Sequence, residues 1–495
     1  MNSGTQVSLN TDLRTLFYPK TIAVIGVNKN RVGGIKFVFA NQEFVTQGGG
    51  QVYPINPKYE ELYGFRVYPS LFHPEVPDID LAYISVQADA VPELIRECGK
   101  KRVKFVVIFT SGFGESGNME LQTQLENAIK DVKPYTRIIG PNCLGINNPY
   151  SKIHYYPGMP SAPGNISYVS MSGGNTGRLA SWQVSQGLGF HNIVSIGNSI
   201  DLTPADFIFH FLKDEKTKTI ALYLESISDG RRFIEAVRKT TLTKPIILLK
   251  GGQSEAGIRA VHSHTGGLAG SSDIWQAISK QYGIIYTDHF ELFQDAVTTF
   301  SIDYHLPKNE NVCVLVAGGG ISVEIADSCI KYGLQIPSLS QETQQSLANV
   351  FPSINTNFHN PVDLGEYGYV PEFFAQALEI VAKDPHIETV LFVREAERFK
   401  LFQETLSRAD MEEKTVESIS NVLKKVQKPM ICSTSPNVQN ERAYGARFQF
   451  KINMLKRNLP VIDYIPNACK IIKQMVCYYR YLQKMERISK KKIES

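Results

Sequence analysis

The chain has 495 residues, of which 43% are hydrophobic and 20% are charged, and its net charge at pH 7 is +4. This length exceeds what a single hydrophobic core supports, so we expect about three domains of an ordinary globular protein. The small net charge and the lack of an arginine-rich stripe argue against a nucleic-acid-binding protein. No apolar stretch reaches the roughly 18 residues of a transmembrane helix, so the sequence predicts no membrane span.

The N-terminal residues and the cysteine pattern indicate in which cellular compartment the protein is expected. The first residues contain no apolar segment of the kind that forms a secretory signal. The seven cysteines are scattered, and none belongs to a CxxC pair. This pattern is typical of free thiols in a reducing environment. We therefore expect a cytoplasmic protein without a zinc site.

Short apolar runs rich in β-branched residues alternate with helical segments in the first third of the chain. This alternation predicts parallel strands that are buried on both faces and joined by right-handed crossovers, as in a doubly wound α/β sheet. A polar stretch at 147–152 marks the end of this unit, so the first domain is expected to span residues 1–149. The expected strands are 21–27, 51–57, 81–87, 105–111 and 137–142.

A glycine turn follows the first expected strand and leads into a helix. Glycines at such a turn let the backbone bend tightly, and the N-terminus of the helix can then hold a phosphate. The alternative is that the glycines only close a tight turn between strand and helix. The candidate ligand-binding residues of this turn are Gly26, Asn28, Lys29 and Gly33.

The second expected strand ends in a way that disfavours NAD. The turn does not have the GxGxxG pattern, and an NAD site needs an acidic residue at this strand end, where the chain has Asn56 and Lys58. A lysine suits a ligand with an additional phosphate. The 3′-phosphate of CoA and NADP both fit this chemistry.

The remaining strand ends of the first unit are small, polar and rich in glycine. Ligands of such sheets lie outside the carboxyl ends of the strands, so a thin pantetheine arm can run along this backbone. Cys143 is a candidate nucleophile, but no histidine is near it in the sequence, and a lone buried cysteine usually only packs. The candidate contacts are Val86, Ser111, Gly112 and Asn142.

A second α/β unit follows, and its first strand end suits an anion. Ser170, Ser172 and Gly173 come directly after an expected strand and open a helix, so their hydroxyl and N–H groups can bind a phosphoryl group. Ordinary N-capping by serine is the alternative. The expected strands of this unit are 165–171, 192–198, 219–226, 244–252 and 283–288.

Two other residues of this unit suit phosphoryl transfer. His262 and His264 lie in a glycine-rich segment, expected to be a loop, where a mobile imidazole can attack a phosphoryl group. Surface histidines of a structural loop are the alternative, and a metal site is disfavoured because no carboxylate or cysteine is close in the sequence. Glu225 ends a buried strand and can hold an imidazole in one tautomer, or pair with a nearby arginine.

A third α/β unit completes the chain. A break near residues 301–312 places the second domain at 150–303 and the third at 304–495, with a helical C-terminal tail that ends in lysines. The expected strands of the third domain are 312–320, 388–395, 428–434 and 459–465.

The combined motifs resemble the α subunit of ADP-forming acyl-CoA synthetases of the acetate–CoA ligase type and, more distantly, that of succinyl-CoA synthetase. The resemblance covers residues 15–300, and the segments at 317–327 and 360–364 look like the ligase domain that follows in that family. It implies a Rossmann-like CoA-binding domain followed by two flavodoxin-like domains. The motifs that carry it are DLAYISV, SGFGE, IIGPNCLGI, GNISYVSMSGG and SHTGGLAG, in this order.

The resemblance also implies an activity, the reversible conversion of acyl-CoA, phosphate and ADP to a carboxylic acid, CoA and ATP. An acyl phosphate forms first, and a phosphohistidine then carries the phosphoryl group. His264 is the implied phosphohistidine, and Glu225 the residue that holds it. The loop from Ser170 to Gly173 is implied to bind the phosphoryl group, and Asn56, Lys58 and the Gly26 turn to bind the nucleotide end of CoA.

Three α/β units leave no room for an ATP-grasp domain. ATP or ADP, with Mg²⁺, is therefore expected on a separate ATP-grasp β subunit in a heterodimer or heterotetramer. Met171 and Gly174 depart from the usual Ser-Gln-Ser-Gly-Ala of the phosphate loop, and Val27 and Asn28 from the usual Ala-Ser of the first turn, so the acyl substrate stays open. A non-catalytic CoA- or acyl-CoA-binding regulatory protein is disfavoured by the presence of both His264 and Glu225, and an NADP-linked dehydrogenase by the missing GxGxxG.

Overall fold

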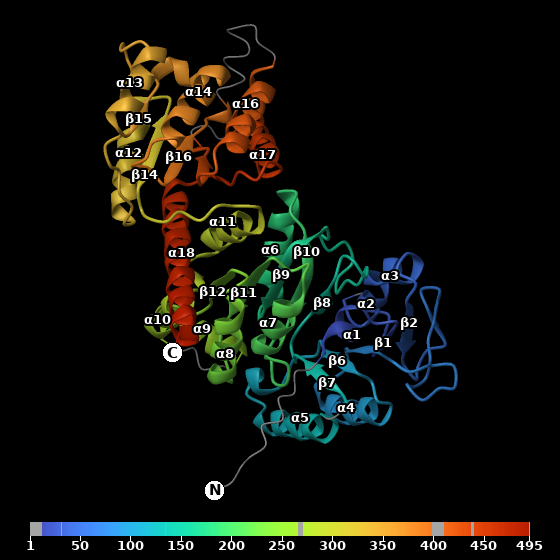
Figure 1. Ribbon diagram of the computed structural model, residues 1–495. Coiled ribbons are helices and arrows are strands. Elements are labelled where there is room, and N and C mark those ends of the chain that lie inside the picture. Colours follow the sequence, from blue (N-terminus) through green and yellow to red (C-terminus); the bar gives the residue numbers. More distant parts are fainter. Residues whose placement is uncertain are drawn as a thin grey trace. The chain divides into compact units, whose positions relative to one another are not determined.

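The computed structural model describes residues 12–30, 32–133, 135–265, 271–397, 410–436 and 440–494, and only the backbone at 262–265 and 492–494. The chain forms two compact units, Met1–Phe290 and Glu291–Ser495, and parallel α/β sheets make up both (Figure 1). The predicted fold class is confirmed. All predicted strands are present, but they end earlier than predicted because their carboxyl ends turn into glycine-rich and polar loops.

The first sheet has the strand order β2-β1-β5-β6-β7, and all of its strands are parallel. This order places β1 between β2 and β5, so the sheet grows to one side of β1 with β2 and to the other side with β5. Open α/β sheets bind ligands at such a junction, which here lies between β1 and β5. The hairpin β3–β4 and the short helix α1 were not predicted. The elements are α1 (Arg14–Phe17), β1 (Thr21–Ile25), α2 (Ile35–Ala40), α3 (Gln42–Thr46), β2 (Gln51–Ile55), β3 (Glu61–Leu62), β4 (Phe65–Arg66), β5 (Leu81–Ile84), η1 (Ala88–Ala90), α4 (Val91–Lys100), β6 (Phe105–Ile108), η2 (Gly114–Ser116), α5 (Met119–Val132) and β7 (Arg137–Ile139).

The second sheet has the order β13-β12-β11-β9-β10-β8, with β8 antiparallel to β10 and the other pairs parallel. Its junction lies at β9, which has β10 on one side and β11 on the other. β8 lies before residue 149, the expected end of the first domain, but it pairs with β10 of the second sheet. The expected domain limits stay predictions. The elements are β8 (Gly145–Asn147), β9 (Pro163–Ser170), α6 (Gly173–Ser185), β10 (Phe190–Ser195), α7 (Pro204–Lys213), β11 (Thr219–Leu224), α8 (Gly230–Thr240), β12 (Ile246–Lys250), α9 (Glu255–Thr265), α10 (Ser272–Tyr282) and β13 (Ile285–Thr287).

A buried carboxylate ties the two sheets of the first unit together. The Asp201 side chain, after β10, is fully buried and accepts hydrogen bonds from Arg137 Nε at 2.9 Å and from the backbone N–H of Ile138 at 2.8 Å, both in β7. Next to it, the N–H of Asn198 donates to the carbonyl of Pro141 at 3.0 Å. Since a buried charge is stable only when it is paired and hydrogen-bonded, this pair fixes the first sheet against the second.

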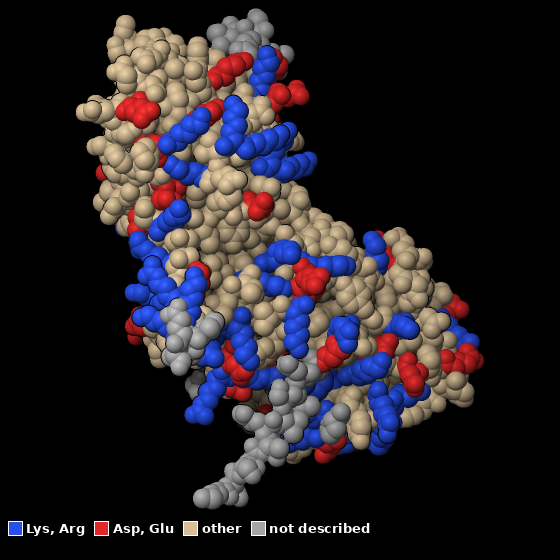
Figure 2. All heavy atoms as spheres, in the orientation of Figure 1, with Lys and Arg blue, Asp and Glu red and all other residues tan. Residues whose placement is uncertain are grey.

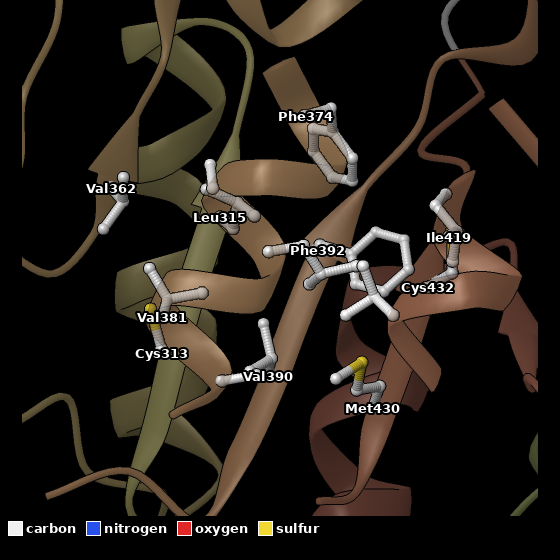
Figure 3. Close-up of a cluster of buried hydrophobic side chains, with 14 of the residues drawn as sticks. Cys313, Leu315, Val362, Phe374, Val381, Val390, Phe392, Ile419, Met430 and Cys432 are labelled. Atoms are coloured by element: carbon white, nitrogen blue, oxygen red, sulfur yellow. The ribbon is translucent and has the colours of Figure 1, made fainter. Parts of the chain in front are cut away.

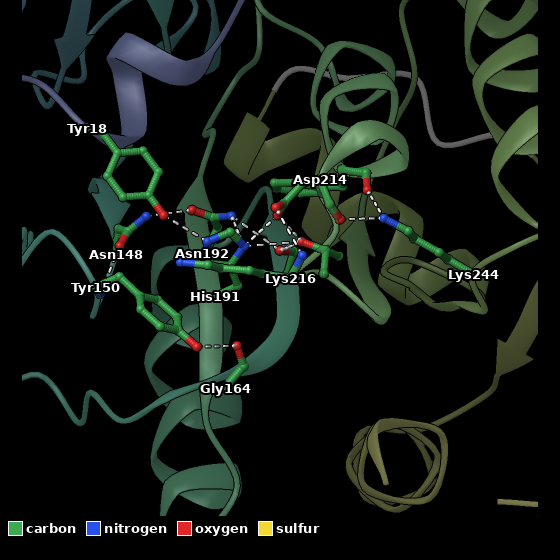
Figure 4. A network of polar contacts seen from close by, with 12 residues as sticks. Tyr18, Asn148, Tyr150, Gly164, His191, Asn192, Asp214, Lys216 and Lys244 are labelled. Carbon is green, nitrogen blue, oxygen red and sulfur yellow. Dashed lines mark hydrogen bonds and ion pairs between the residues drawn. The ribbon is translucent and has the colours of Figure 1, made fainter. Parts of the chain in front are cut away.

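A polar network occupies the opposite, amino edge of the second sheet (Figure 4). Tyr18 bonds His191 Nε2 at 2.9 Å, and His191 Nδ1 lies 2.5 Å from Asp214 Oδ2. Burial would raise the pKa of Asp214, but hydrogen bonds from His191 and Thr217 outweigh burial and lower it to about 2. The network borders a cavity of about 870 Å³ between α1, α7 and the start of β10.

His210, beside this cavity, gives the fold a pH dependence. Its ring stacks on Phe17 with centroids 5.2 Å apart, and burial lowers the pKa of His210 to about 4. An unfolded histidine titrates near about 6.5, so the unfolded chain takes up the proton first, and stability falls as the pH drops from about 6.5 towards 4. The His210→Phe variant keeps the ring stacking but has no group to protonate. We expect its melting temperature to fall less between about pH 7 and pH 5 than that of the unchanged protein. Equal losses would contradict this.

The second unit contains the third sheet, in the order β15-β14-β16-β17-β18 and all parallel. Its core lies on one face of the sheet, where Leu315, Phe374 and Phe392 pack among aliphatic side chains (Figure 3). The two-residue strand β15 was not predicted. The elements are α11 (Phe290–Ser301), β14 (Val312–Val316), α12 (Gly319–Lys331), α13 (Gln341–Val350), β15 (Val362–Asp363), η3 (Gly365–Tyr369), α14 (Pro371–Ala382), β16 (Thr389–Val393), α16 (Met411–Lys425), β17 (Met430–Ser433), α17 (Glu441–Leu455), β18 (Val461–Ile462) and α18 (Ile465–Glu494).

The surface carries charges of both signs. Basic and acidic side chains lie beside one another over much of the face shown in Figure 2, as the small net charge suggests. Among the described residues, none of the helices has the length and apolar character that a membrane crossing requires.

Candidate active site

The predicted glycine turn sits at the β1/β5 junction of the first sheet. Gly26 has φ +92°, and a Cβ added to it would lie 2.2 Å from the carbonyl oxygen of Ser85 and 2.6 Å from Val86 Cγ1. Gly34 also packs closely, since a Cβ added to it would lie 2.9 Å from the Gly26 carbonyl oxygen. The turn leads into α2, so the predicted strand–turn–helix is present, and only glycine fits its first position.

Two asparagines brace this turn from inside. Asn28 Oδ1 accepts from the N–H of Asn30 at 2.8 Å, and Asn56 Nδ2 donates to the carbonyl of Val27 at 2.7 Å. Asn56 Oδ1 also accepts from the N–H of Lys58 at 2.9 Å. The amide of Asn56 therefore holds the ends of β1 and β2 together, while the side chains of Lys29 and Lys58 are exposed at the same edge.

The ends of β5, β6 and β7 line up beside this turn. Thr110 Oγ1 donates to the carbonyl of Val86 at 2.9 Å, and the N–H of Asn142 donates to the carbonyl of Thr110 at 3.0 Å. Gly112 and Asn142 both have positive φ, at 110° and 58°. The structure thus brings the predicted pantetheine contacts Val86, Gly112 and Asn142, with Ser111 between them, to one edge of the sheet.

Glu115 organises the loop after β6. Its Oε1 accepts from the N–H of Gly112 at 2.6 Å, and its Oε2 accepts from Asn198 Nδ2 of the second sheet at 2.8 Å. The N–H of Gly112 is therefore already occupied, which leaves its carbonyl for a ligand. No role was predicted for Glu115, although a carboxylate in a glycine-rich loop is a visible signal in the sequence.

Cys143 is inert in this arrangement. It is buried, its Sγ lies 3.4 Å from the carbonyl of Ile108, and burial raises its pKa to about 12. A thiol with this pKa is a poor nucleophile near neutral pH, so the packing interpretation of Cys143 holds.

The predicted phosphate loop lies at the junction of the second sheet. Ser170 ends β9 with its side chain buried, and the N–H of Ser172 donates to Ser170 Oγ at 3.1 Å. Ser172 is the N-cap of α6, because its Oγ accepts from the N–H of Asn175 at 3.3 Å. N-capping is thus part of its role. Gly173 and Gly174 open the helix, where backbone N–H groups have no intrahelical acceptor and can meet an anion.

Glu225 meets this loop from the neighbouring strand. It follows β11, which pairs with β9 so that Tyr223 lies opposite Ser170. The N–H of Glu225 contacts Met171 Sδ at 3.3 Å, and the N–H of Met171 donates to the carbonyl of Tyr223 at 3.0 Å. Only 6% of Glu225 is exposed. The structure therefore brings Glu225 to Ser170–Gly173, two groups about 50 residues apart.

Two further residues surround Glu225. Burial and then the Glu225 carboxylate raise the pKa of Tyr223 to about 12, so its hydroxyl stays protonated. Lys250 ends β12 with 1% exposure, and burial lowers its pKa although Glu225 opposes this. Neither residue was predicted, although a lysine that closes a buried strand is a visible signal in the sequence; Tyr223 has no such signal.

The histidine segment differs from the prediction in one respect. His262 and His264 were expected in a loop, but their backbone belongs to the last turns of α9. The helix continues to Thr265 because glycines begin only at residue 266. Their side chains and residues 266–270 lie outside the described part. α9 packs on Gly252, whose Cβ would lie 2.9 Å from Val261 Cγ2, and it lies against η2 in the loop after β6.

The ligand edge of the first sheet and the predicted phosphate loop are neighbours. Leu144 follows Asn142 and Cys143, and its side chain lies 3.1 Å from the position of a Cβ on Gly173. The N–H of Leu144 donates to Ser195 Oγ at 3.2 Å. The first sheet's ligand edge therefore continues directly into the start of α6.

Comparison with known domain families agrees with this architecture. Residues 20–149 match the family described as a CoA binding domain. Residues 163–300 match the succinyl-CoA ligase like flavodoxin domain.

Relatives that align with about three quarters of the chain show the family. The α subunit of ADP-forming acetate–CoA ligase II from Pyrococcus furiosus is 35% identical over 378 residues, which are 76% of this chain and 81% of that one. The chain belongs to the ADP-forming acetate–CoA ligase family. Other members are longer, and the chain spans about half of each: 49% of the Methanocaldococcus jannaschii acetate–CoA ligase, with 39% identity over 71% of this chain, and 54% of acetate–CoA ligase I of Archaeoglobus fulgidus.

A solved structure has the same fold. The dinucleotide forming acetyl-coenzyme A synthetase 1 of Ca. Korarchaeum cryptofilum, in complex with phosphate and ADP, superposes with a TM-score of 0.80 at 30% identity. The alignment covers 96% of this chain and 99% of that one. The third sheet, which neither domain family covers, is thus included in the likeness.

Proposed function

We propose that this chain is the α subunit of an NDP-forming acyl-CoA synthetase, which interconverts acyl-CoA, ADP and phosphate with a carboxylic acid, CoA and ATP. One observation carries the proposal. α9, the helix that contains His264, lies against η2 at the ligand edge of the first sheet. That edge continues into the phosphate loop and Glu225 of the second sheet.

In this mechanism the chain performs the thioester half of the reaction. Phosphate attacks the thioester carbonyl and displaces CoA. The acyl phosphate then passes its phosphoryl group to the imidazole of His264 and releases the carboxylic acid. Glu225 holds the imidazole so that one nitrogen is free to attack. The N–H groups at the start of α6, near Ser172 and Gly173, stabilise the negative charge of the phosphoryl group.

The second half needs a nucleotide, and we propose that ADP or ATP binds with Mg²⁺ on a separate ATP-grasp β subunit. A relative named as an α subunit supports a complex of several chains. We expect a heterodimer or heterotetramer in the cytoplasm. CoA and a small carboxylic acid are the ligands of this subunit.

Phosphoryl labelling tests the proposal. The purified chain is incubated with γ-labelled ATP, Mg²⁺ and the β subunit, and we expect acid-labile, base-stable label on this chain that is lost in His264→Ala. His262→Ala, two residues away in α9, is the matched control and should keep the label. Binding of CoA without any label would instead indicate a non-catalytic CoA-binding protein.

Lys58→Glu tests the CoA end. Lys58 is exposed at the β2 end beside the glycine turn, where we place the 3′-phosphate. We expect the variant to bind CoA about tenfold or more weakly, because a carboxylate repels the additional phosphate. Its affinity for dephospho-CoA should fall much less. Calorimetric titration of both ligands measures this, with Lys100→Glu in α4 as the control. Equal losses for both ligands would place the 3′-phosphate elsewhere.

A further inference from the structure

Lys36 of α2 is a buried cation that no carboxylate pairs. Only 5% of the residue is exposed, and within the described ranges its Nζ makes no hydrogen bond or ion pair. Its Nζ faces aromatic rings instead, 3.5 Å from the ring centroid of Phe109, 5.0 Å from that of Phe37 and 5.9 Å from that of Tyr156.

Such a site is unusual on energetic grounds. Burying an ammonium group costs several kcal/mol unless an anion compensates it, and the faces of aromatic rings return only about 1–2 kcal/mol. Burial alone lowers the pKa of Lys36 to about 8. Tyr83 of β5 stacks on Phe37, and burial raises the pKa of its hydroxyl, so it cannot balance the charge. Tyr156, near the same Nζ, is a phenol and not a carboxylate. An anion of a bound ligand would supply the missing countercharge.

The position of Lys36 indicates which part of the ligand it meets. Phe109 directly follows β6, and its N–H donates to the carbonyl of Ile84 at 3.0 Å, so the amine lies at the carboxyl edge of β5 and β6. In the sheet order, β6 is three strands from β2, where Asn56 and Lys58 are placed at the nucleotide end. Three strand spacings are about 14 Å. Lys36 is thus on the pantetheine side, away from the phosphates.

We propose that Lys36 is a catalytic residue that meets the sulfur atom of CoA when the carbon–sulfur bond breaks or forms. The inference rests on the proposed function. In the direction of thioester cleavage, a phosphate oxygen bonds to the carbonyl carbon, and the electron pair of the carbon–sulfur bond leaves on sulfur. The ammonium of Lys36 pairs with the thiolate and then gives it a proton, which leaves CoA thiol and a neutral amine. In the reverse direction the amine takes the thiol proton.

The ionisation of bound CoA tests the proposal. The thiolate absorbs ultraviolet light more strongly than the thiol, so a pH titration of CoA on the full chain yields the pKa of the bound thiol. With Lys36 present we expect this pKa to lie about one unit or more below that in Lys36→Met. Lys100→Met on the exposed face of α4 is the matched control and should titrate like the unchanged chain.

A second measurement separates sulfur from phosphate. Lys36→Met should bind desulfo-CoA as tightly as the unchanged chain does, and it should slow acyl transfer from acyl phosphate to CoA by roughly 10²-fold. An equal loss of affinity for CoA and desulfo-CoA would show that Lys36 serves a phosphate or the fold, and would overturn the inference. So would an unchanged thiol pKa in a variant that binds CoA. A chain that binds no CoA at all would instead remove the proposed function, and the inference with it.

Discussion

Glu225→Gln is expected to lower the rate of ATP formation from acyl-CoA by roughly 10⁴-fold, the effect of losing a carboxylate that orients a catalytic imidazole. The carboxylate is buried at the junction of the second sheet, between Met171 and the hydroxyl of Tyr223. Glutamine keeps the size of the side chain but cannot stabilise an imidazolium or select the same tautomer. Steady-state assays of the complex with its β subunit measure the loss.

The control for this variant is Glu235→Gln in α8, an exposed carboxylate that pairs with Lys239 at 2.7 Å. It should leave the rate unchanged. The melting temperature of Glu225→Gln should stay close to that of the unchanged protein, because the amide can take the same place. A rate within a few-fold of the unchanged enzyme would remove Glu225 from the mechanism.

Gly26→Ala is expected to destabilise the first unit by about 3 kcal/mol or more and to abolish CoA binding. The added methyl group would lie 2.2 Å from the carbonyl oxygen of Ser85, and the backbone at φ +92° disfavours any side chain. Because the collision is with backbone, β1 and β5 must move apart, which opens the sheet at its ligand-binding junction. Denaturant unfolding and CoA titration measure the two effects.

Gly64→Ala separates the two causes. Gly64, in the β3–β4 turn, has a similar φ of +82°, but nothing lies within 4 Å of its added Cβ. It should therefore show only the conformational part, about 1–2 kcal/mol, and normal CoA affinity. If both variants lose the same stability, the close approach of Gly26 to Ser85 is not what requires glycine.

The fold could be predicted because its strands are buried on both faces. A run such as residues 312–316 is apolar throughout, and the segments between such runs have apolar residues at helical spacing. The α/β class and every long strand could therefore be predicted. The short strands β3, β4, β8 and β15, of two or three residues each, carry no such pattern. β15 exists because Val362 and Asp363 align with the end of β14 in space, a long-range pairing that local sequence does not encode.

The candidate site was predictable only where function leaves a local motif. Glycine turns, the N-cap Ser172 and the strand-end Glu225 are visible in sequence, and the strand order then brings them to the ligand edge. Lys36 could not be found this way, because its distinguishing property is burial without a carboxylate beside its Nζ. Its burial by Phe109 and Tyr156 depends on segments more than 70 residues distant. The helical backbone at His264 was also missed, since the following glycines suggested a loop.

The central claim is that one imidazole carries the phosphoryl group between the thioester site on this chain and the nucleotide on its partner. The most direct test is the initial rate of ATP formation by the purified complex from acyl-CoA, phosphate and ADP, with His264 replaced by alanine or asparagine. We predict no ATP above background for either variant, while CoA still binds. ATP formation at the unchanged rate would contradict the account.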